Sequence, residues 1–281
     1  MKKITRRSFM AAAGLTVAAL ALTACGGSSS TASSAAASSV ASSAAASSEA
    51  ASAAADVTTV EAGKLTMATN AAFPPYEMTT DAGEFEGIDI ETAQAIADKL
   101  GLELQIDDMD FDAALLSVQQ GKADIVMAGV TVTDERKAVM DFSDSYATGI
   151  QSIVVPEGSD IASPDDLAGK KIGTQRGTTG YIYCSDDFGD ENVVAYDDGL
   201  TAVQALNNGQ VDAVVIDNAP AKEFVAANPG LVILDTSYAE EDYAIGVAKG
   251  SSLKDAVNAA LEELKADGTL QSIVDKYITA E

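Results

Sequence analysis

Apolar and polar positions follow two alternating periodicities between residues 57 and 130. Short apolar runs rich in β-branched residues at 64–70, 102–106 and 124–130 predict strands. Between these runs, apolar residues recur at helical spacing over 90–100 and 110–121, and a glycine ends each helical run. This part of the chain is therefore expected to fold as β-α-β-α-β, which is typical of a sheet covered by helices.

The same alternation continues to the end of the chain. Apolar runs at 151–155, 171–175, 212–217 and 243–248 predict four more strands. A helical turn is expected at 165–169, and a glycine-bearing loop at 176–180 leads into a helix. Further helices are expected at 200–207, 220–227, 253–266 and 270–278. The pattern predicts an α/β protein of one large or two small domains.

Residues 1–24 have the pattern of an export signal. A basic start, which contains Arg6 and Arg7, precedes an uncharged apolar run that is too short to indicate a membrane span. Residues 5–9 (TRRSF) resemble the twin-arginine export motif, and a general secretory signal remains open as the alternative. Residues 22–25 (LTAC) resemble the bacterial lipobox, so we expect cleavage before Cys25 and lipidation, for example with palmitate, at its thiol.

A segment rich in serine and alanine follows Cys25. Residues 26–55 contain 13 Ala and 12 Ser, show no apolar periodicity and carry almost no charge, so they cannot form a hydrophobic core. As a random coil this length spans on the order of 30 Å. We interpret 25–56 as a tether between a membrane anchor and a folded domain, and a glycan-bearing stalk is the alternative.

Composition excludes several classes of function. The formal net charge is −26, which disfavours binding to nucleic acids and electrostatic attraction to anionic lipids. The chain contains no histidine, the commonest metal ligand and general base, and its two cysteines, Cys25 and Cys184, are too few for a structural zinc site. Neither a metal nor a cofactor is expected, and Cys184 is interpreted as a free structural thiol.

Residues 129–146 (GVTVTDERKAVMDFSDSY) contain a candidate carboxylate-binding arrangement. A predicted strand end is followed by Thr131 and Thr133, and Arg136 lies one turn into a predicted helix. A guanidinium can bind a carboxylate through two parallel hydrogen bonds, and the free amides at a helix start favour the same negative charge. On these residues alone, a solvated Arg136 with threonine caps is the simpler interpretation.

Nine segments, two of which overlap the stretch 129–146, support the functional interpretation. They are 73–77 (FPPYE), 87–90 (GIDI), 121–124 (GKAD), 128–136 (AGVTVTDER), 141–144 (DFSD), 166–170 (DLAGK), 177–179 (GTT), 212–217 (DAVVID) and 267–270 (DGTL). In this order and spacing they resemble family 3 of the bacterial extracellular solute-binding proteins, which are the amino-acid-binding components of ABC importers.

The resemblance extends over residues 57–281 and implies the type II periplasmic-binding-protein-like fold, in which two α/β lobes are joined by two crossing hinge segments. One lobe would consist of 57–149 with 243–281, and the other of 150–242. The cleft between the lobes would be the binding site, and hinge closure would be the associated motion.

By the same resemblance, the α-carboxylate of a bound amino acid would contact four residues. Arg136 would bind it through its guanidinium fork, helped by the main-chain N–H of Thr131 and by donors from Thr178 and Thr179. An ordinary turn explains Thr178 and Thr179 equally well.

The α-ammonium group would bind to Asp217, which ends a predicted strand. The carbonyl of Gly129 and the hydroxyl of Thr131 would accept its other hydrogen bonds. A helix cap is the alternative role for Asp217.

The ligand side chain would lie between the rings of Phe73 and Phe111, whose alternative role is ordinary core packing. Asn70 and Gln175 would contact its far end. Members of the family that bind cationic ligands often carry an acid at the position of Asn70, so an amide there favours a neutral polar ligand. Tyr76 and Glu77 are expected to lie behind these residues.

The resemblance further implies a binding protein without enzymatic activity. Its partners would be a free L-amino acid, the permease subunits of an ABC transporter and, through Cys25, the outer face of the cell membrane, with the protein itself a monomer. A periplasmic-type dehydratase on the same scaffold is the main alternative, and it would need an additional positioned acid in the cleft. A sensory ligand-binding domain is the second alternative.

Overall fold

A computed structural model describes residues 57–278. The predicted signal peptide (1–24), the lipidation site at Cys25 and the predicted tether (25–56) lie outside the described residues. Within this range, no helix is long and apolar enough to cross a membrane.

One mixed sheet of eight strands organises the described part of the chain, in the order β5-β1-β6-β11-β7-β10-β8-β9. Strand β1 is parallel to β5 and β6 on one side, and β8 is parallel to β9 and β10 on the other. The strands are β1 (Lys64–Thr69), β5 (Glu103–Asp108), β6 (Ile125–Val126), β7 (Met140–Pro156), β8 (Ile172–Gln175), β9 (Val193–Tyr196), β10 (Ala213–Asp217) and β11 (Leu231–Ala248).

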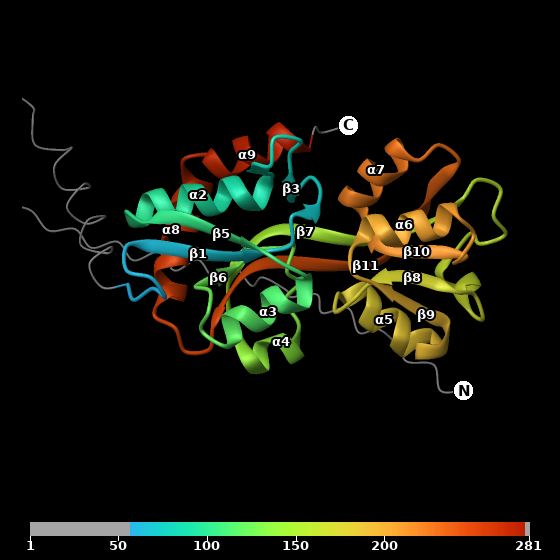
Figure 1. Cartoon of the computed structure of the whole chain (residues 1–281), viewed down its shortest axis with the longest axis horizontal. Helices are drawn as coiled ribbons and strands as arrows, with labels where there is room; N and C mark the ends of the chain where they lie inside the picture. Colours follow the sequence, from blue (N-terminus) through green and yellow to red (C-terminus); the bar gives the residue numbers. More distant parts are fainter. Residues whose placement is uncertain (1–56, 279–281) are drawn as a thin grey trace, which may run out of the picture. The chain divides into compact units, whose positions relative to one another are not determined.

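Two long antiparallel strands, β7 and β11, run through both halves of this sheet (Figure 1). They divide the fold into a first lobe around β1 and a second lobe around β8, and they form the two crossing segments that the resemblance implied. Their pairing shifts register at four places, for example between Ile233 and Ser237, so the ribbon between the lobes is irregular. The exact lobe boundaries, 57–149 with 243–281 and 150–242, stay a prediction.

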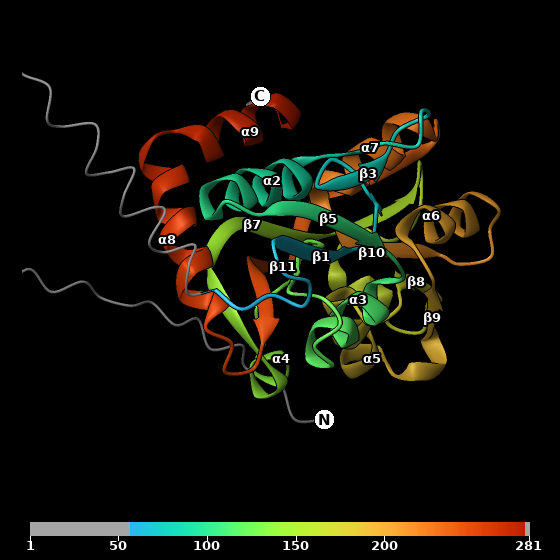
Figure 2. The same cartoon turned by 60° about the vertical axis from the view of Figure 1, so that its left-hand side comes forward.

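Helices cover both faces of the sheet in the first lobe. Helices α2 (Ile88–Leu100), α8 (Leu253–Ala266) and α9 (Thr269–Tyr277) lie on one face, and α3 (Phe111–Gln119) and α4 (Asp134–Val139) lie on the other (Figures 1 and 2). Successive side chains of β1 point to opposite faces, so Met67 joins the α2 cluster and Ala68 joins the α3 cluster. The strand is consequently buried on both sides and reads as a continuous apolar run.

The second lobe has the same layered construction. Helices α6 (Gly199–Asn207) and α7 (Asn218–Ala227) cover one face, and α5 (Thr179–Phe188) with the 3-10 turn η2 (Pro164–Leu167) covers the other. In β10, Val214 packs toward α6 and Val215 packs toward α5. Cys184 of α5 is a free buried cysteine, as expected from the sequence, and burial raises the pKa of its thiol to about 12.

A small antiparallel sheet connects β1 to α2. It consists of β2 (Ala72–Phe73), β3 (Glu77–Thr79) and β4 (Phe85–Glu86). Gly87 ends this sheet with φ 130°, and a Cβ atom there would lie 2.2 Å from the carbonyl oxygen of Tyr76, so only glycine fits. This close approach fixes Phe73 and Glu77 relative to the start of α2.

Three strand predictions need correction. The apolar run 124–130 forms a strand only at Ile125–Val126, because its later residues bend into the loop that carries Gly129. Strand β7 begins at residue 140 rather than 151, and β11 begins at 231 rather than 243, because each is paired with the other through polar residues. Strand β9, together with the short 3-10 turn η3 (Asp190–Asn192) before it, was not predicted.

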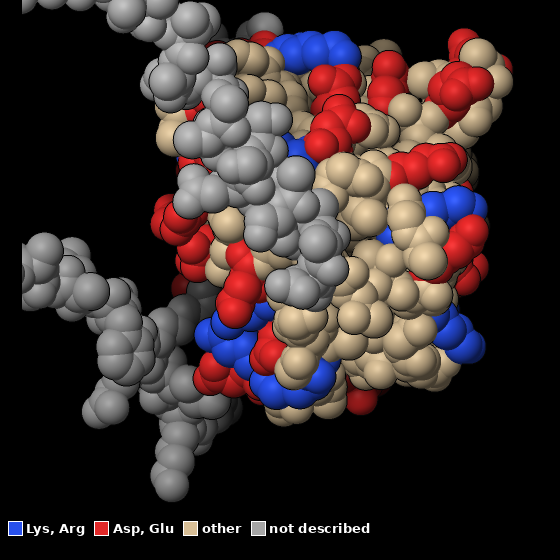
Figure 3. All heavy atoms as spheres, turned by 90° about the vertical axis from the view of Figure 1, so that its left-hand side faces the viewer, with Lys and Arg blue, Asp and Glu red and all other residues tan. Residues whose placement is uncertain are grey.

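Acidic side chains recur over the molecular face in Figure 3, and basic side chains lie beside them. Ion pairs such as Lys99–Glu263, at 3.0 Å, and Lys249–Asp141, at 2.8 Å, are of this kind. Since such pairs are exposed, each contributes at most about 1 kcal/mol to stability.

Candidate functional site

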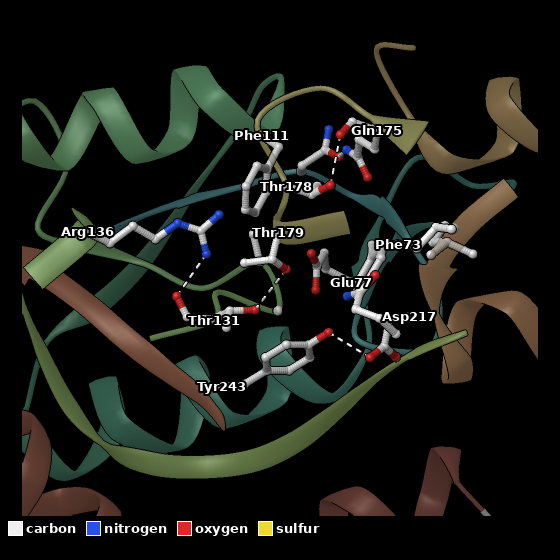
Figure 4. A pocket seen from close by; sticks show the side chains of 16 residues that line it. Phe73, Glu77, Phe111, Thr131, Arg136, Gln175, Thr178, Thr179, Asp217 and Tyr243 are labelled. Carbon is white, nitrogen blue, oxygen red and sulfur yellow. Dashed lines mark hydrogen bonds between the residues drawn. The ribbon is translucent and has the colours of Figure 1, made fainter. Parts of the chain in front are cut away.

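The predicted site residues follow the carboxyl ends of parallel strands from both lobes. Asn70 follows β1, Phe111 begins the helix after β5, Gln175 ends β8 and Asp217 ends β10. Loops at the carboxyl ends of such strands are where α/β sheets form ligand sites. All ten predicted residues line one pocket between the lobes (Figure 4): Asn70, Phe73, Phe111, Gly129, Thr131, Arg136, Gln175, Thr178, Thr179 and Asp217.

Arg136 is buried in the first turn of α4, so it is not the solvated helix residue of the simpler interpretation. Its Nη1 donates to the carbonyl of Thr131 at 2.8 Å, and its Nη2 donates across the cleft to the carbonyl of Gly177 at 3.1 Å. The guanidinium stacks over the ring of Phe111 at 5.3 Å. Burial lowers its pKa. A guanidinium has five N–H donors, so three remain for an anionic ligand.

Thr178 and Thr179 start helix α5 at the edge of the pocket. The hydroxyl of Thr178 donates to the carbonyl of Gln175 at 2.8 Å and accepts from the N–H of Tyr181 at 3.3 Å, so it caps the helix. Thr179 is the first residue of α5, and its main-chain N–H therefore has no partner within the helix. The hydroxyl of Thr178 is thus occupied, and its main-chain N–H makes a long bond of 3.4 Å to the carbonyl of Gln175, while the N–H of Thr179 remains as a donor at the start of the helix.

Gly129 lies where two aromatic rings leave no room for a side chain. Its φ is +56°, and a Cβ atom would lie 2.9 Å from the Phe73 ring and 3.2 Å from the Tyr243 ring. Its N–H donates to Asp89 at 3.0 Å. The glycine lets the backbone approach the pocket, where the carbonyl was predicted to accept from an ammonium group.

Asp217 has the helix-cap role that the sequence left open as the alternative, and it also lines the pocket. Its Oδ1 accepts from the N–H of Ala219 at 3.1 Å, which caps α7. Its Oδ2 accepts from the N–H of Ile150 and the hydroxyl of Tyr243, both at 2.8 Å. Burial raises its pKa to about 6, although these three hydrogen bonds oppose the shift. The carboxyl group is a helix cap that also lines the pocket.

Asn70 and Gln175 link the two lobes directly. The amide of Gln175 donates to Oδ1 of Asn70 at 2.8 Å, and the amide of Asn70 donates to the carbonyl of Met109 at 2.9 Å. Phe73 stacks on Tyr76 with ring centroids 5.8 Å apart, and Phe111 belongs to the core cluster around α3. The two phenylalanines therefore serve in packing and also line the pocket.

Glu77 lines the pocket as well, and the sequence placed it only behind the predicted residues. Its side chain is fully buried, and burial together with the neighbouring Asp89 raises its pKa well above the usual value. Asp89 accepts from the N–H of Gly129 and the hydroxyl of Tyr146, and burial raises its pKa to about 6. Two neighbouring buried carboxyl groups disfavour double ionisation, which is the second reason why the pKa of Glu77 is raised.

Sequence reasoning missed Gln151, Tyr243 and Glu241, which come from the crossing strands. Gln151 and Tyr243 line the pocket, and Glu241 accepts a hydrogen bond from Gln151 at 3.0 Å. The only signal in the sequence was the position of Glu241 two residues before a predicted strand start, which places it on the same face as Tyr243. Within residues 57–278, no cluster of three acidic or cysteine side chains has a metal-binding arrangement.

The pocket is lined from both lobes by a guanidinium and a carboxyl group, as expected for a zwitterion site. The sequence profile of the bacterial extracellular solute-binding proteins, family 3, matches residues 65–280. The chain belongs to this family. Its relatives are amino-acid-binding proteins, and some of them are named as components of ABC transporters.

Relatives within the family bind different amino acids. The chain is 34% identical over 226 residues to the L-cystine-binding protein TcyJ of Escherichia coli (strain K12), covering 79% of this chain and 85% of that protein. It is 34% identical over 228 residues to the arginine-binding extracellular protein ArtP of Bacillus subtilis (strain 168), covering 78% of this chain and 87% of that protein.

Crystal structures of an ancestral arginine-binding protein match the fold closely. With glutamine bound, that protein superposes with a TM-score of 0.75 and 42% identity, over 78% of this chain and 100% of its own. With arginine bound, the TM-score is 0.73 and the identity 43%, over 77% and 98%. These relatives are binding proteins, so the comparisons support the transport interpretation rather than a dehydratase.

Proposed function

We propose that this member of the family binds a free polar L-amino acid as a zwitterion between its two lobes. The α-carboxylate binds Arg136, the main-chain N–H of Thr179 and, in exchange for its 3.4 Å bond to the carbonyl of Gln175, the N–H of Thr178. The α-ammonium binds Asp217, the carbonyl of Gly129 and the hydroxyl of Thr131. The observation that carries the proposal is that Arg136 and Asp217 reach one pocket from opposite lobes.

Ligand binding then stabilises the closed arrangement of the lobes, because only that arrangement offers both contacts at once. Shifting a hinge from 1:99 to 99:1 requires about 5.5 kcal/mol of preference, and hydrogen bonds to charged groups contribute about 1.5–3 kcal/mol each. The direct contacts between the lobes, from Gln175 to Asn70 and from Arg136 to Gly177, add to this preference.

The far end of the pocket favours a ligand side chain with N–H donors. Among the lining residues, Glu77 carries a carboxyl group, Asn70 has an amide oxygen that accepts from Gln175, and Phe73 and Phe111 provide apolar walls. Glutamine and arginine, which the ancestral relative holds in its two crystal structures, both have such side chains. The amide at Asn70 favours the neutral one, whereas an ionised Glu77 would favour the cationic one.

A thermal-shift screen over the common L-amino acids tests the proposal. A ligand at 1,000 times its Kd stabilises the folded state by about 4 kcal/mol, which corresponds to roughly 8–16 °C for a domain of this size. We expect one or a few polar amino acids to produce such a shift. A screen in which no amino acid stabilises the protein would contradict the proposal.

We expect Glu77→Gln to separate cationic from neutral ligands. A glutamine can replace a protonated Glu77 as donor and acceptor, but it cannot neutralise a guanidinium. Affinity for L-arginine should fall at least about 30-fold, since unpairing a buried charge costs at least about 2 kcal/mol, while affinity for L-glutamine should change little.

Isothermal titration calorimetry with both amino acids measures the Glu77→Gln effect, and Glu84→Gln, at an exposed position between β3 and β4, is the matched control. Equal losses for the two ligands would show that Glu77 does not distinguish side-chain charge.

We further propose that the protein is a lipoprotein, held at the outer face of the cell membrane through Cys25 and delivering its ligand to permease subunits. The motif at 22–25 and the tether-like composition of 25–56 support this. Cells grown with a labelled fatty acid should label the wild-type protein and the Cys184→Ala variant, but not Cys25→Ala. Persistent labelling of Cys25→Ala would refute the anchor.

A further inference from the structure

Glu241 is a buried carboxyl group behind the pocket, on the crossing strand β11. Its side chain is 6% exposed, and it shares a strand face with Tyr243 two residues later. It is not among the residues that line the pocket, and the proposed zwitterion contacts do not use it. Its partners are what connect it to ligand binding.

One oxygen atom of Glu241 collects hydrogen bonds from both lobes and from the second crossing strand. Its Oε2 accepts from the hydroxyl of Thr131 at 3.1 Å, from the hydroxyl of Thr179 at 3.0 Å and from Nε2 of Gln151 at 3.0 Å. Thr131 is held beside β11 by an isolated bridge to Tyr243, while Thr179 starts helix α5 of the second lobe. Both hydroxyl groups line the pocket.

These bonds fix the polarity of the two hydroxyl groups. A hydroxyl has a single proton and two lone pairs, so a hydroxyl that donates to a carboxylate can only accept from any other partner. Thr131 and Thr179 therefore present lone pairs, and no O–H donor, to a molecule in the pocket. An ammonium group, which has three donors and no acceptor, matches them, whereas a carboxylate does not.

We infer that Glu241 is a positioning residue that turns Thr131 and Thr179 into acceptors and thereby makes the pocket selective for the α-amino group of its ligand. The inference rests on the proposed function and deepens it. It assigns any contact of Thr179 with the ligand carboxylate to the main-chain N–H, which is free at the start of α5.

The same bonds couple recognition of the amino group to lobe closure. The hydroxyl groups of Thr131 and Thr179 come from different lobes and lie 3.5 Å apart (Figure 4). They share one acceptor atom, Oε2 of Glu241. Both can therefore face the same ammonium group only while the lobes are together. Separation of the lobes breaks at least one bond to Glu241.

Amino acids and their des-amino analogues distinguish this role from simple packing. The probes are L-glutamine against 4-carbamoylbutanoate and L-arginine against 5-guanidinopentanoate, and calorimetry gives the Kd ratio within each pair. In Glu241→Ala, the preference for the bound amino acid over its analogue should fall at least about tenfold, since hydroxyls released from Glu241 no longer have to accept.

Two variants complete the design. Glu241→Gln should keep most of the preference, because an amide oxygen can accept the same hydrogen bonds. Glu240→Ala, at the exposed neighbouring position on the opposite strand face, should leave the ratio unchanged. Thr131→Val should lower the ratio as Glu241→Ala does, and it provides the test if Glu241→Ala does not fold.

Equal weakening of the amino acid and its analogue in Glu241→Ala overturns the inference and leaves the proposed function intact. Equal weakening in Thr131→Val overturns the inference together with the Thr131 contact of the proposed function. A wild-type protein that binds none of the common amino acids overturns both.

Discussion

Arg136→Ala is expected to lower the affinity for the transported amino acid by at least about 30-fold, because removing one partner of a buried charge pair costs about 2–5 kcal/mol. The side chain is buried and lines the pocket, and its two hydrogen bonds to main-chain carbonyls use two of its five N–H donors. The substitution also removes the bond to the carbonyl of Gly177, so the closed arrangement loses one contact between the lobes. Isothermal titration calorimetry with the amino acid found in the thermal-shift screen measures the loss.

Arg176→Ala is the matched control for this experiment. Arg176 lies in the loop between β8 and α5 with 53% of its side chain exposed, and its nearest acid is Asp197 at 3.6 Å. We expect its removal to leave affinity within about twofold of wild type, since exposed ion pairs contribute little. An Arg136→Ala protein with a native circular dichroism spectrum and unchanged affinity would exclude Arg136 from the site.

Asp217→Asn is expected to weaken binding by about 100-fold at pH 7.5, because the ligand ammonium loses its buried anionic partner. The substitution should also remove a pH dependence. In the empty wild-type protein the pKa of Asp217 is raised to about 6, mainly through burial. At pH 5 only about a tenth of the molecules carry an ionised Asp217, so wild-type affinity should fall about tenfold between pH 7.5 and 5. In Asp217→Asn this tenfold change in affinity between pH 7.5 and 5 should be absent.

The stability of the empty protein against unfolding should decrease as the pH rises, whereas the affinity for the ligand increases. Because the folded state raises the pKa of Asp217 above its value of 3.8 in the unfolded chain, the group contributes most stability below 3.8. That contribution is lost as the pH rises through about 6. The buried Asp89 acts in the same sense, since its pKa is also raised to about 6. Thermal unfolding of the empty protein at several pH values measures the trend, which Asp217→Asn should weaken.

Asp212→Asn provides the control for Asp217. Asp212 is exposed and immediately precedes β10, the strand that Asp217 ends, and its carboxylate accepts from the N–H of Lys171. An asparagine can keep that bond, so affinity and its pH profile should match wild type. If Asp217→Asn binds as tightly as wild type at pH 7.5, another group must neutralise the ammonium.

The sequence by itself predicted the order of most helices and strands, because each buries an apolar face whose period can be read locally. Thr133 before α4 and Gly101 after α2 mark helix ends for the same local reason, through a side-chain cap and a left-handed backbone. The site residues Arg136 and Asp217 were found through motif order, and the structure brings both to the pocket.

Tertiary structure decided what depended on distant pairing. Strands β7 and β11 extend through polar stretches such as 141–146 because each provides hydrogen-bond partners for the main chain of the other. Such pairing cannot be predicted from the local periodicity of the sequence. Burial of Glu77 and Glu241 is equally invisible in the sequence, since acidic residues are most often exposed. The hydroxyls that bind Glu241 lie 48 residues apart in the chain, and only the closing of two lobes around the crossing strands brings them to one carboxylate.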